Sequence, residues 1–112
     1  MRYAIPVTNG VLSSHFGHCQ NFVLFDVDDM KKEIITKTVI DSPPHQPGVL
    51  PGWLAGEGVS MIIAGGMGSR AQELFIQNNI QVILGAPDVD PDLLLHQHLT
   101  GTMETSDNIC DH

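Results

Sequence analysis

The stretch from Val59 to Leu84 constrains the fold of this chain more than any other segment. Val59 to Ala64 is a compact apolar run, Gly65-Gly66-Met67-Gly68 turns the chain, and an amphipathic segment then runs from Ser69 to the Asn78-Asn79 pair. Ile80 to Leu84 supplies a second apolar run. Two buried strands joined through a helix pair in parallel by a right-handed crossover, so this segment predicts an α/β fold.

The first forty residues predict three further strands. Arg2 to Val7, Phe22 to Val27 and Glu33 to Ile40 are short runs rich in β-branched and aromatic residues, and Asp28 to Lys32 has the polar composition of a turn. These strands form a β-meander. Added to the crossover, they predict an α/β domain with a mixed five-stranded sheet flanked by helices.

Helix boundaries are readable at three places. Val49 to Glu57 carries apolar residues at helical spacing and predicts a short helix. Ser69 and Gln72 have the spacing of a capping box at the start of the next helix. The last helix begins with Asp90 as N-cap and Pro91 in the first turn, and it ends near Gly101.

Length and charge limit the function. The chain has 112 residues, a hydrophobic fraction of 42% and a charged fraction of 16%, which predicts one globular domain. No apolar run reaches the ~20 residues of a membrane-spanning helix. The formal net charge of −8 disfavours nucleic acid as a partner, and the start of the chain lacks the pattern of a secretory signal, so we expect a cytoplasmic protein.

One loop holds the densest set of metal-binding side chains. His15, His18 and Cys19 lie in the Gly- and Ser-containing connection between the first two predicted strands. Imidazole and thiolate are ligands for transition metals, so these three residues are candidate metal ligands. The spacing is not that of a zinc finger or ribbon. A buried Cys19 with histidines that only form hydrogen bonds in the loop is the alternative.

Three more candidate ligands lie in other irregular segments. His45 is in the proline-rich connection from Asp41 to Gly48, and Cys110 and His112 end the chain. We expect residues 1–101 to form the domain and 102–112 to form a flexible tail, which can fold back and complete a metal site. The alternatives are a tail with incidental residues and, less favoured in a reducing compartment, a disulfide between Cys19 and Cys110.

The glycine turn suggests a second kind of ligand. Gly66 to Ala71 matches the G-x-G-x-x-A form of the dinucleotide fingerprint, and Asp88 lies about 20 residues further on, where a ribose-binding acid is expected. The chain is too short for two mononucleotide-binding halves. The turn is therefore better explained as a loop that presents helix amides, with Met67 or Arg70, to an anionic ligand.

Other polar clusters are weaker signals. Asp26, Asp28 and Asp29 suggest a two-metal nuclease, although acidic residues in a turn usually face water. His96 and His98 are two residues apart on a predicted helix, so they point in different directions and make a poor ligand pair.

The sequence resembles the dinitrogenase iron-molybdenum cofactor biosynthesis family. The resemblance rests on Ser14-His15-Phe16-Gly17-His18, on Phe22 to Asp26, on Ile62 to Ala71 and on the closing strand and helix, so it covers nearly the whole chain. It implies a ribonuclease H-like α/β fold and the binding of a nitrogenase cofactor or a related cluster, without catalysis. It also implies that two loops, Ser13 to Gly17 and Gly65 to Gly68, face the ligand. Together with Arg70 from the anion-binding argument, the candidate cofactor-binding residues are Ser14, Gly65, Gly66, Met67, Gly68 and Arg70.

These observations lead to one preferred function. We expect a non-enzymatic carrier of a metal or metal–sulfur cluster, iron-molybdenum or iron–sulfur in type, with zinc or copper as further options for the metal. Its partners are then proteins that donate or accept the cluster, and the carrier itself is a monomer or a weak dimer. The Cys110-Asp111-His112 ending resembles short stand-alone family members more than longer nitrogenase-assembly carriers. The alternatives are a phosphate- or nucleotide-binding protein that uses Gly65 to Arg70, and an interaction domain without a ligand.

Overall fold

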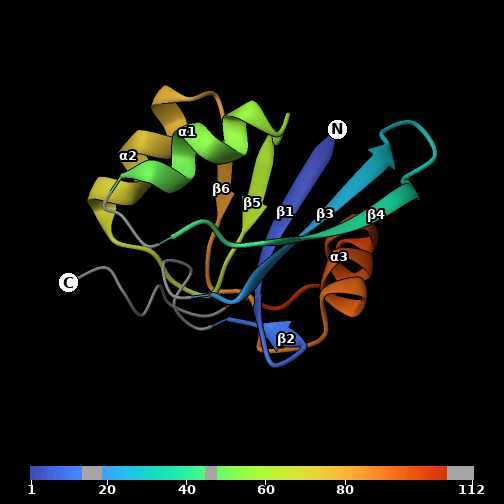
Figure 1. Cartoon of the computed structure of the whole chain (residues 1–112). Helices are drawn as coiled ribbons and strands as arrows, with labels where there is room; N and C mark the ends of the chain where they lie inside the picture. The colour runs from blue at the N-terminus through green and yellow to red at the C-terminus, as the bar shows by residue number, and fades with distance from the viewer. Residues whose placement is uncertain (14–18, 45–47, 106–112) are drawn as a thin grey trace.

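The structure is a computed structural model that describes residues 1–13, 19–44 and 48–105. Within these ranges the chain forms one mixed sheet and three helices (Figure 1). The strands are β1 (Arg2–Thr8), β2 (Val11–Leu12), β3 (Asn21–Asp28), β4 (Glu33–Asp41), β5 (Met61–Ile63) and β6 (Gln81–Ile83). The helices are α1 (Val49–Gly56), α2 (Ser69–Gln77) and α3 (Pro91–Thr100).

The sheet has a parallel half and an antiparallel half. The strands follow the order β4-β3-β1-β5-β6, in which β3 is antiparallel to both β1 and β4, whereas β5 is parallel to β1 and β6. The predicted meander and the predicted parallel pair joined through a helix are therefore both confirmed, and so is the α/β class. The ribonuclease H-like label stays a prediction.

The predicted number of strands was too low. The sheet has six strands because the short β2 pairs with the end of β1, through Val7 opposite Leu12 and Thr8 opposite Val11. Asn9 and Gly10 connect the two strands with positive φ angles of 54° and 83°. This is the conformation that Asn-Gly favours in a two-residue hairpin turn. A two-residue strand is too short to give an alternating pattern, so the turn was the only available signal.

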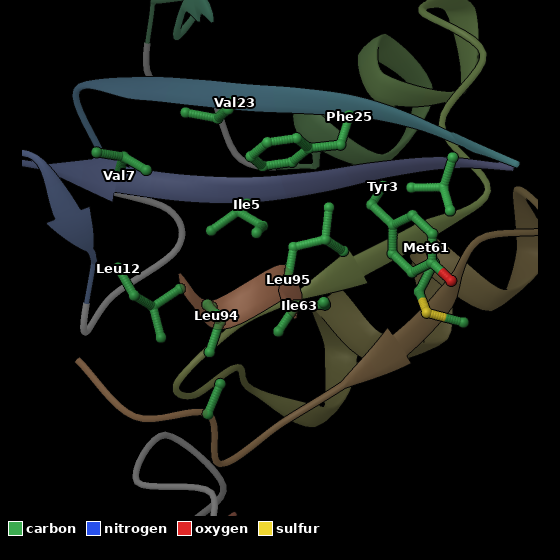
Figure 2. Close-up of a cluster of buried hydrophobic side chains, with 12 residues drawn as sticks. Tyr3, Ile5, Val7, Leu12, Val23, Phe25, Met61, Ile63, Leu94 and Leu95 are labelled. Atoms are coloured by element: carbon green, nitrogen blue, oxygen red, sulfur yellow. The ribbon is translucent and has the colours of Figure 1, made fainter. Parts of the chain in front are cut away.

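Helices cover both faces of the sheet. On one face, α3 places Leu94 and Leu95 against a buried cluster that includes Ile5 and Phe25 (Figure 2). On the other face, Leu54 of α1 and Phe75 of α2 pack against side chains from β1, β3 and β5. Successive residues of a strand point to opposite faces, so β1 and β3 contribute to both clusters and are apolar along nearly their whole length.

The predicted limits of α2 and α3 both agree with the structure, but the predicted capping is confirmed only at α3. The Asp90 carboxylate accepts hydrogen bonds from the backbone N–H groups of Asp92 and Leu93, and Gly101 ends α3 with a φ of 72°. The capping box predicted for α2 is wrong. Gly68 is the N-cap residue and Ser69 is already helical, while the Gln72 side chain donates to the carbonyl oxygen of Met67 over 3.0 Å. No helix within the described ranges is long and apolar enough to cross a membrane.

Candidate metal-binding edge of the sheet

Several connecting segments meet at one end of the sheet, which we call the carboxyl edge. It is defined here by Ser13, Cys19, Ser42, the glycine segment Gly65–Gly68, and Gly85 with Ala86. β1, β5 and β6 are parallel, so the chain leaves all three strands at this end, and β3 begins there. In open α/β sheets, ligands bind outside the carboxyl ends of the strands, so this edge is where the fold favours a site.

The glycine segment lies beside the histidine-containing connection. A Cβ atom added to Gly65 would lie 3.7 Å from the carbonyl oxygen of Ala86 and 3.8 Å from that of Ser13. The backbone of Gly65 also accepts a hydrogen bond from the N–H of Gly85 over 3.1 Å. Thus the segments that follow β2, β5 and β6 are in direct contact. Ser13, the described start of the histidine-containing connection, therefore lies beside the glycine segment.

The other described end of the same connection is Cys19. Its neighbour Gln20 donates a backbone hydrogen bond to Val7 at the end of β1, over 3.0 Å. The Cys19 side chain is buried in the cluster that also contains Phe22 and Met67. Burial raises the pKa of the Cys19 thiol, because a thiolate loses hydration in apolar surroundings, and the contact with Ser42 only partly opposes that change.

Ser42 is a contact that the sequence did not reveal. Its hydroxyl oxygen lies 3.2 Å from the sulfur of Cys19, and its backbone N–H donates to Gln20 over 3.1 Å. The residue follows β4, so the pairing of β3 with β4 brings it to Cys19 from 23 positions away. No local pattern marks Ser42, and only the register of the sheet could have identified it.

The candidates on the glycine segment have different environments. Met67 is fully buried in the apolar core, so its thioether packs against carbon in this conformation. Gly65 and Gly66 are buried, Gly68 is partly exposed, and Arg70 is exposed on the first turn of α2. Gly68 provides no side chain to cap α2, and the first-turn amides therefore carry the partial positive charge of a helix start.

Six candidates lie outside the described residues: Ser14, His15, His18, His45, Cys110 and His112. Within the ranges that the structure does describe, no group of three or more His, Cys, Asp and Glu side chains is placed to hold a metal ion. Cys19 is a free, buried thiol in this conformation. Among the described candidates, the structure brings together Cys19, Met67 and the glycine segment.

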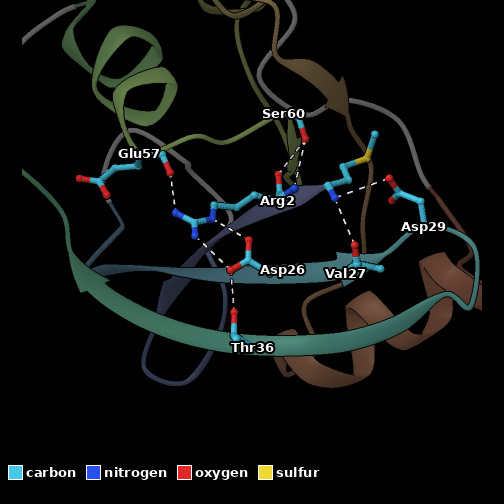
Figure 3. Close-up of polar contacts among 8 residues, drawn as sticks. Arg2, Asp26, Val27, Asp29, Thr36, Glu57 and Ser60 are labelled. Carbon is cyan, nitrogen blue, oxygen red and sulfur yellow. Dashed lines mark hydrogen bonds and ion pairs between the residues drawn. The ribbon is translucent and has the colours of Figure 1, made fainter.

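The acidic cluster near the end of β3 has structural contacts at the opposite end of the sheet (Figure 3). The Arg2 side chain donates to both carboxylate oxygens of Asp26 over 2.8 and 3.0 Å, and Thr36 donates to Asp26 over 2.6 Å. These hydrogen bonds, that of Arg2 above all, lower the pKa of Asp26 to about 2. Asp28 accepts from backbone amides of its own turn, and Asp29 pairs with the amino terminus. These contacts do not converge on a two-metal site.

The two histidines of α3 are separate, as their spacing predicts. The ring of His98 packs edge-on against Tyr3, with 5.4 Å between the ring centroids, whereas His96 is exposed. Burial lowers the pKa of His98, because the charged imidazolium would lose hydration there. His98 therefore belongs to the packing between α3 and β1.

Comparison with known proteins identifies the family. The profile of the family described as "Dinitrogenase iron-molybdenum cofactor" matches residues 1–101. The chain belongs to this family. An uncharacterized protein of Methanocaldococcus jannaschii, MJ0580, is 32% identical over 85 residues, which are 73% of this chain and 72% of that protein.

Solved structures share the fold. The crystal structure of PH0822 has a TM-score of 0.84 and 27% sequence identity, with 95% of each chain covered. The M. jannaschii protein MJ0327, provisionally described as a dinitrogenase, has a TM-score of 0.74 and 21% identity, with 96% of each chain covered. The family match does not favour the dinucleotide alternative. The sheet agrees with this result, because β3 and β4 are antiparallel and the described strands form a single parallel half, where a dinucleotide fold has two.

Proposed function

We propose that this family member binds a metal ion or metal–sulfur cluster as cargo at the carboxyl edge and transfers it to a partner protein without catalysing a reaction. The observation that carries the proposal is the position of the histidine-containing connection. Ser13 and Cys19, its described ends, both lie at the carboxyl edge, and Ser13 contacts the glycine segment. His15 and His18 lie between these two ends in the sequence, and we assign them as ligands at that edge.

The charge of the chain sets a requirement on the site. A net charge of −8 repels an anionic cluster at long range, so local positive groups must offset it. The carboxyl edge contains the start of α2, whose first-turn amides have no side-chain cap, and the exposed cation Arg70. Together with the imidazoles of His15 and His18, these groups supply donors for the anionic part of a cluster.

The proposed ligands divide into an initial set and a completing set. His15 and His18 are proposed to bind metal through an imidazole nitrogen, whereas Cys19 binds only after its thiol loses a proton and leaves the apolar cluster. His45, Cys110 and His112 are the proposed completing ligands from other segments. A site assembled from loops closes when the metal is present and reopens for transfer, and this suits a carrier.

Anaerobic reconstitution tests this function. The parent protein is incubated with ferrous iron and sulfide, and separately with zinc, and metal per chain and the visible absorption spectrum are then measured. We expect His15→Ala combined with His18→Ala to abolish loading, and His96→Ala, on the exposed face of α3, to load like the parent. Circular dichroism checks that each variant is folded. A parent that takes up neither metal, or a double variant that loads fully, would contradict the proposal.

Transfer is tested separately from binding. Loaded protein is mixed with an apo iron–sulfur acceptor, and the two are separated and analysed for iron. We expect the acceptor to gain iron faster from the loaded protein than from free iron and sulfide in the same buffer. Iron that stays with this chain would support a storage site in place of a carrier.

A further inference from the structure

The outer edge of β4 is unusually open for a strand of nine residues. β4 is the terminal strand of the sheet, and no other described strand pairs with its outer side. Eight of its nine residues are exposed and the ninth is half-buried. Exposed apolar side chains include Ile35 at 65% and Val39 at 59%. Long apolar edge strands readily pair with another strand, and proteins usually protect them.

Val39 is the uncovered end of a row of side chains that crosses the sheet. Ile5 of β1 lies opposite Val23 of β3, and Val23 lies opposite Val39 of β4. Directly paired residues point to the same face, so the row runs along the face that α3 covers. Ile5 and Val23 are buried there (Figure 2). Val39 instead borders a hollow of about 380 Å³ that is also lined by Val7 and by Asp90 at the start of α3.

We propose that a second copy of this chain pairs with β4 in antiparallel orientation, with the two-fold axis at Val39. Val39 then packs against Val39 of the second copy, and the buried row continues across the axis. Residues two positions before and after Val39 face each other across the axis, so Lys37 of each copy lies opposite Asp41 of the other. An isologous pair of this kind forms two identical ion pairs and closes as a dimer.

Charge and regularity favour this register over axes at Lys37 or Ile35. A two-fold axis at Lys37 would place the two lysines opposite each other, which is unfavourable. An axis at Ile35 would fall on a bulge, because the pairing with β3 shifts between Thr36 and Ile34. With the axis at Val39, the paired segment is regular. Lys37 already binds Asp92 over 2.9 Å and Asp41 accepts from Asn21 over 2.9 Å, so the new ion pairs extend existing contacts.

A second copy fits this edge better than an unrelated strand does. A generic apolar strand would place no side chain of opposite charge across from Lys37 and Asp41. The same sequence in antiparallel orientation satisfies both at once. The net charge of −8 on each copy opposes association, so the dimer is expected to strengthen when salt screens that repulsion.

Sedimentation equilibrium of the full chain, from about 10 µM to about 1 mM, tests the proposal. We expect a concentration-dependent dimer for the parent and a monomer for Val39→Asp. Ile76→Asp is the matched control, because Ile76 is 66% exposed on α2 and away from β4, and this variant should dimerise like the parent. A parent that stays monomeric, or a Val39→Asp variant that dimerises equally well, would overturn the proposal.

A charge exchange tests the register. Lys37→Asp alone should weaken the dimer about tenfold, because two ion pairs become repulsive. Combining it with Asp41→Lys should restore the affinity, since opposite charges again face each other. Asp92→Asn removes only the contact of Lys37 within one copy and should leave the dimer within about twofold of the parent. If the double variant dimerised as weakly as Lys37→Asp, the proposed pairing of Lys37 with Asp41 would be overturned.

Discussion

The hydroxyl oxygen of Ser42 lies 3.2 Å from the sulfur of Cys19. This contact links the segment after β4 to the described end of the histidine-containing connection, and it lies at the margin of the apolar core. Burial raises the pKa of the Cys19 thiol, whereas the hydrogen bond to Ser42 lowers it. Because burial is the larger effect, Cys19 is protonated near neutral pH in the metal-free protein.

The first prediction concerns the reactivity of that thiol. In a Cys110→Ser background, Cys19 should react slowly with an alkylating reagent at pH 7, because only the thiolate is nucleophilic. The rate should rise only when the pH exceeds the ordinary thiol pKa, and Ser42→Ala should shift this rise to still higher pH. Alkylation rates measured across the pH range, for the parent background and for Ser42→Ala, test both expectations. If folded Cys19 reacted at pH 7 as fast as in urea, the thiol would not be buried.

The raised thiol pKa has a consequence for stability. At pH values above the unfolded thiol pKa, the unfolded chain binds fewer protons than the folded chain, so the free energy of unfolding falls as the pH rises further. Below that pKa the stabilisation linked to the protonated Cys19 thiol is fully present. The parent should therefore lose more stability than Cys19→Ala between neutral pH and about pH 10, as measured by urea unfolding.

The second prediction separates packing from metal binding at Met67. Met67→Leu conserves volume in the core and should cost less than about 1.5 kcal/mol in the free energy of unfolding. Met67→Ala should cost about 2 to 5 kcal/mol, because it leaves a cavity. Metal per chain after reconstitution should be unchanged in Met67→Leu. Reduced loading by this stable variant would instead identify the thioether as a ligand.

The third prediction uses the ion pair between Arg2 and Asp26. Hydrogen bonds from Arg2 and, second, from Thr36 lower the pKa of Asp26 from its ordinary value of 3.8 to about 2. The stabilisation is present above pH 4 and is lost as the pH falls towards 2, since protonation of the folded chain then removes the charge. About a third of each side chain is exposed, so solvent screens the pair, and Asp26→Asn should cost about 1 kcal/mol at pH 7.

Urea unfolding at pH 7 and at pH 2.5 or lower measures this difference. The difference in the free energy of unfolding between the parent and Asp26→Asn should be smaller in acid than at pH 7. Asp88→Asn, at an exposed position, is the control and should match the parent at both pH values within about 0.5 kcal/mol. If this difference in the free energy of unfolding were independent of pH, the loss of stability in Asp26→Asn would come from packing and not from the ion pair.

The fourth prediction concerns the start of α3. The Asp90 carboxylate accepts a hydrogen bond from the backbone N–H of Asp92 over 2.7 Å. Removing the carboxylate should leave this N–H without a side-chain partner. Asp90→Ala should therefore cost about 1 kcal/mol, and Asp90→Asn should retain most of the stability because Asn caps helices equally well. Thermal unfolding measures both variants, with an expected decrease of about 4 to 8 °C for Asp90→Ala. Equal melting temperatures for Ala and Asn would contradict the capping role.

Local signals predicted most of the elements. The alternating and apolar runs of β1, β3 and β4 predicted strands, and Asp90 with Gly101 predicted the limits of α3. The signals failed where an element was too short or a motif was ambiguous. β2 has two residues, and the serine of the supposed capping box is already inside α2 because the preceding Gly68 is extended.

The candidate site was predictable in composition but not in arrangement. Histidine, cysteine and glycine stand out in the sequence, and Gly65 does lie against Ser13. Burial was predicted only as an alternative for Cys19 and was not predicted for Met67. Both residues lie in connecting segments of the sequence, yet both side chains join the core. Ser42 reaches Cys19 only through the pairing of β3 with β4.

The sequence by itself determined the α/β class, the family and the residue types available for metal binding, because these depend on periodicity, turn residues and side-chain chemistry along the chain. Only the tertiary structure decided which of those side chains are buried, which strand is left at the edge, and which distant segments meet. Those properties depend on strand order and register, which join residues far apart in the chain and have no local signature.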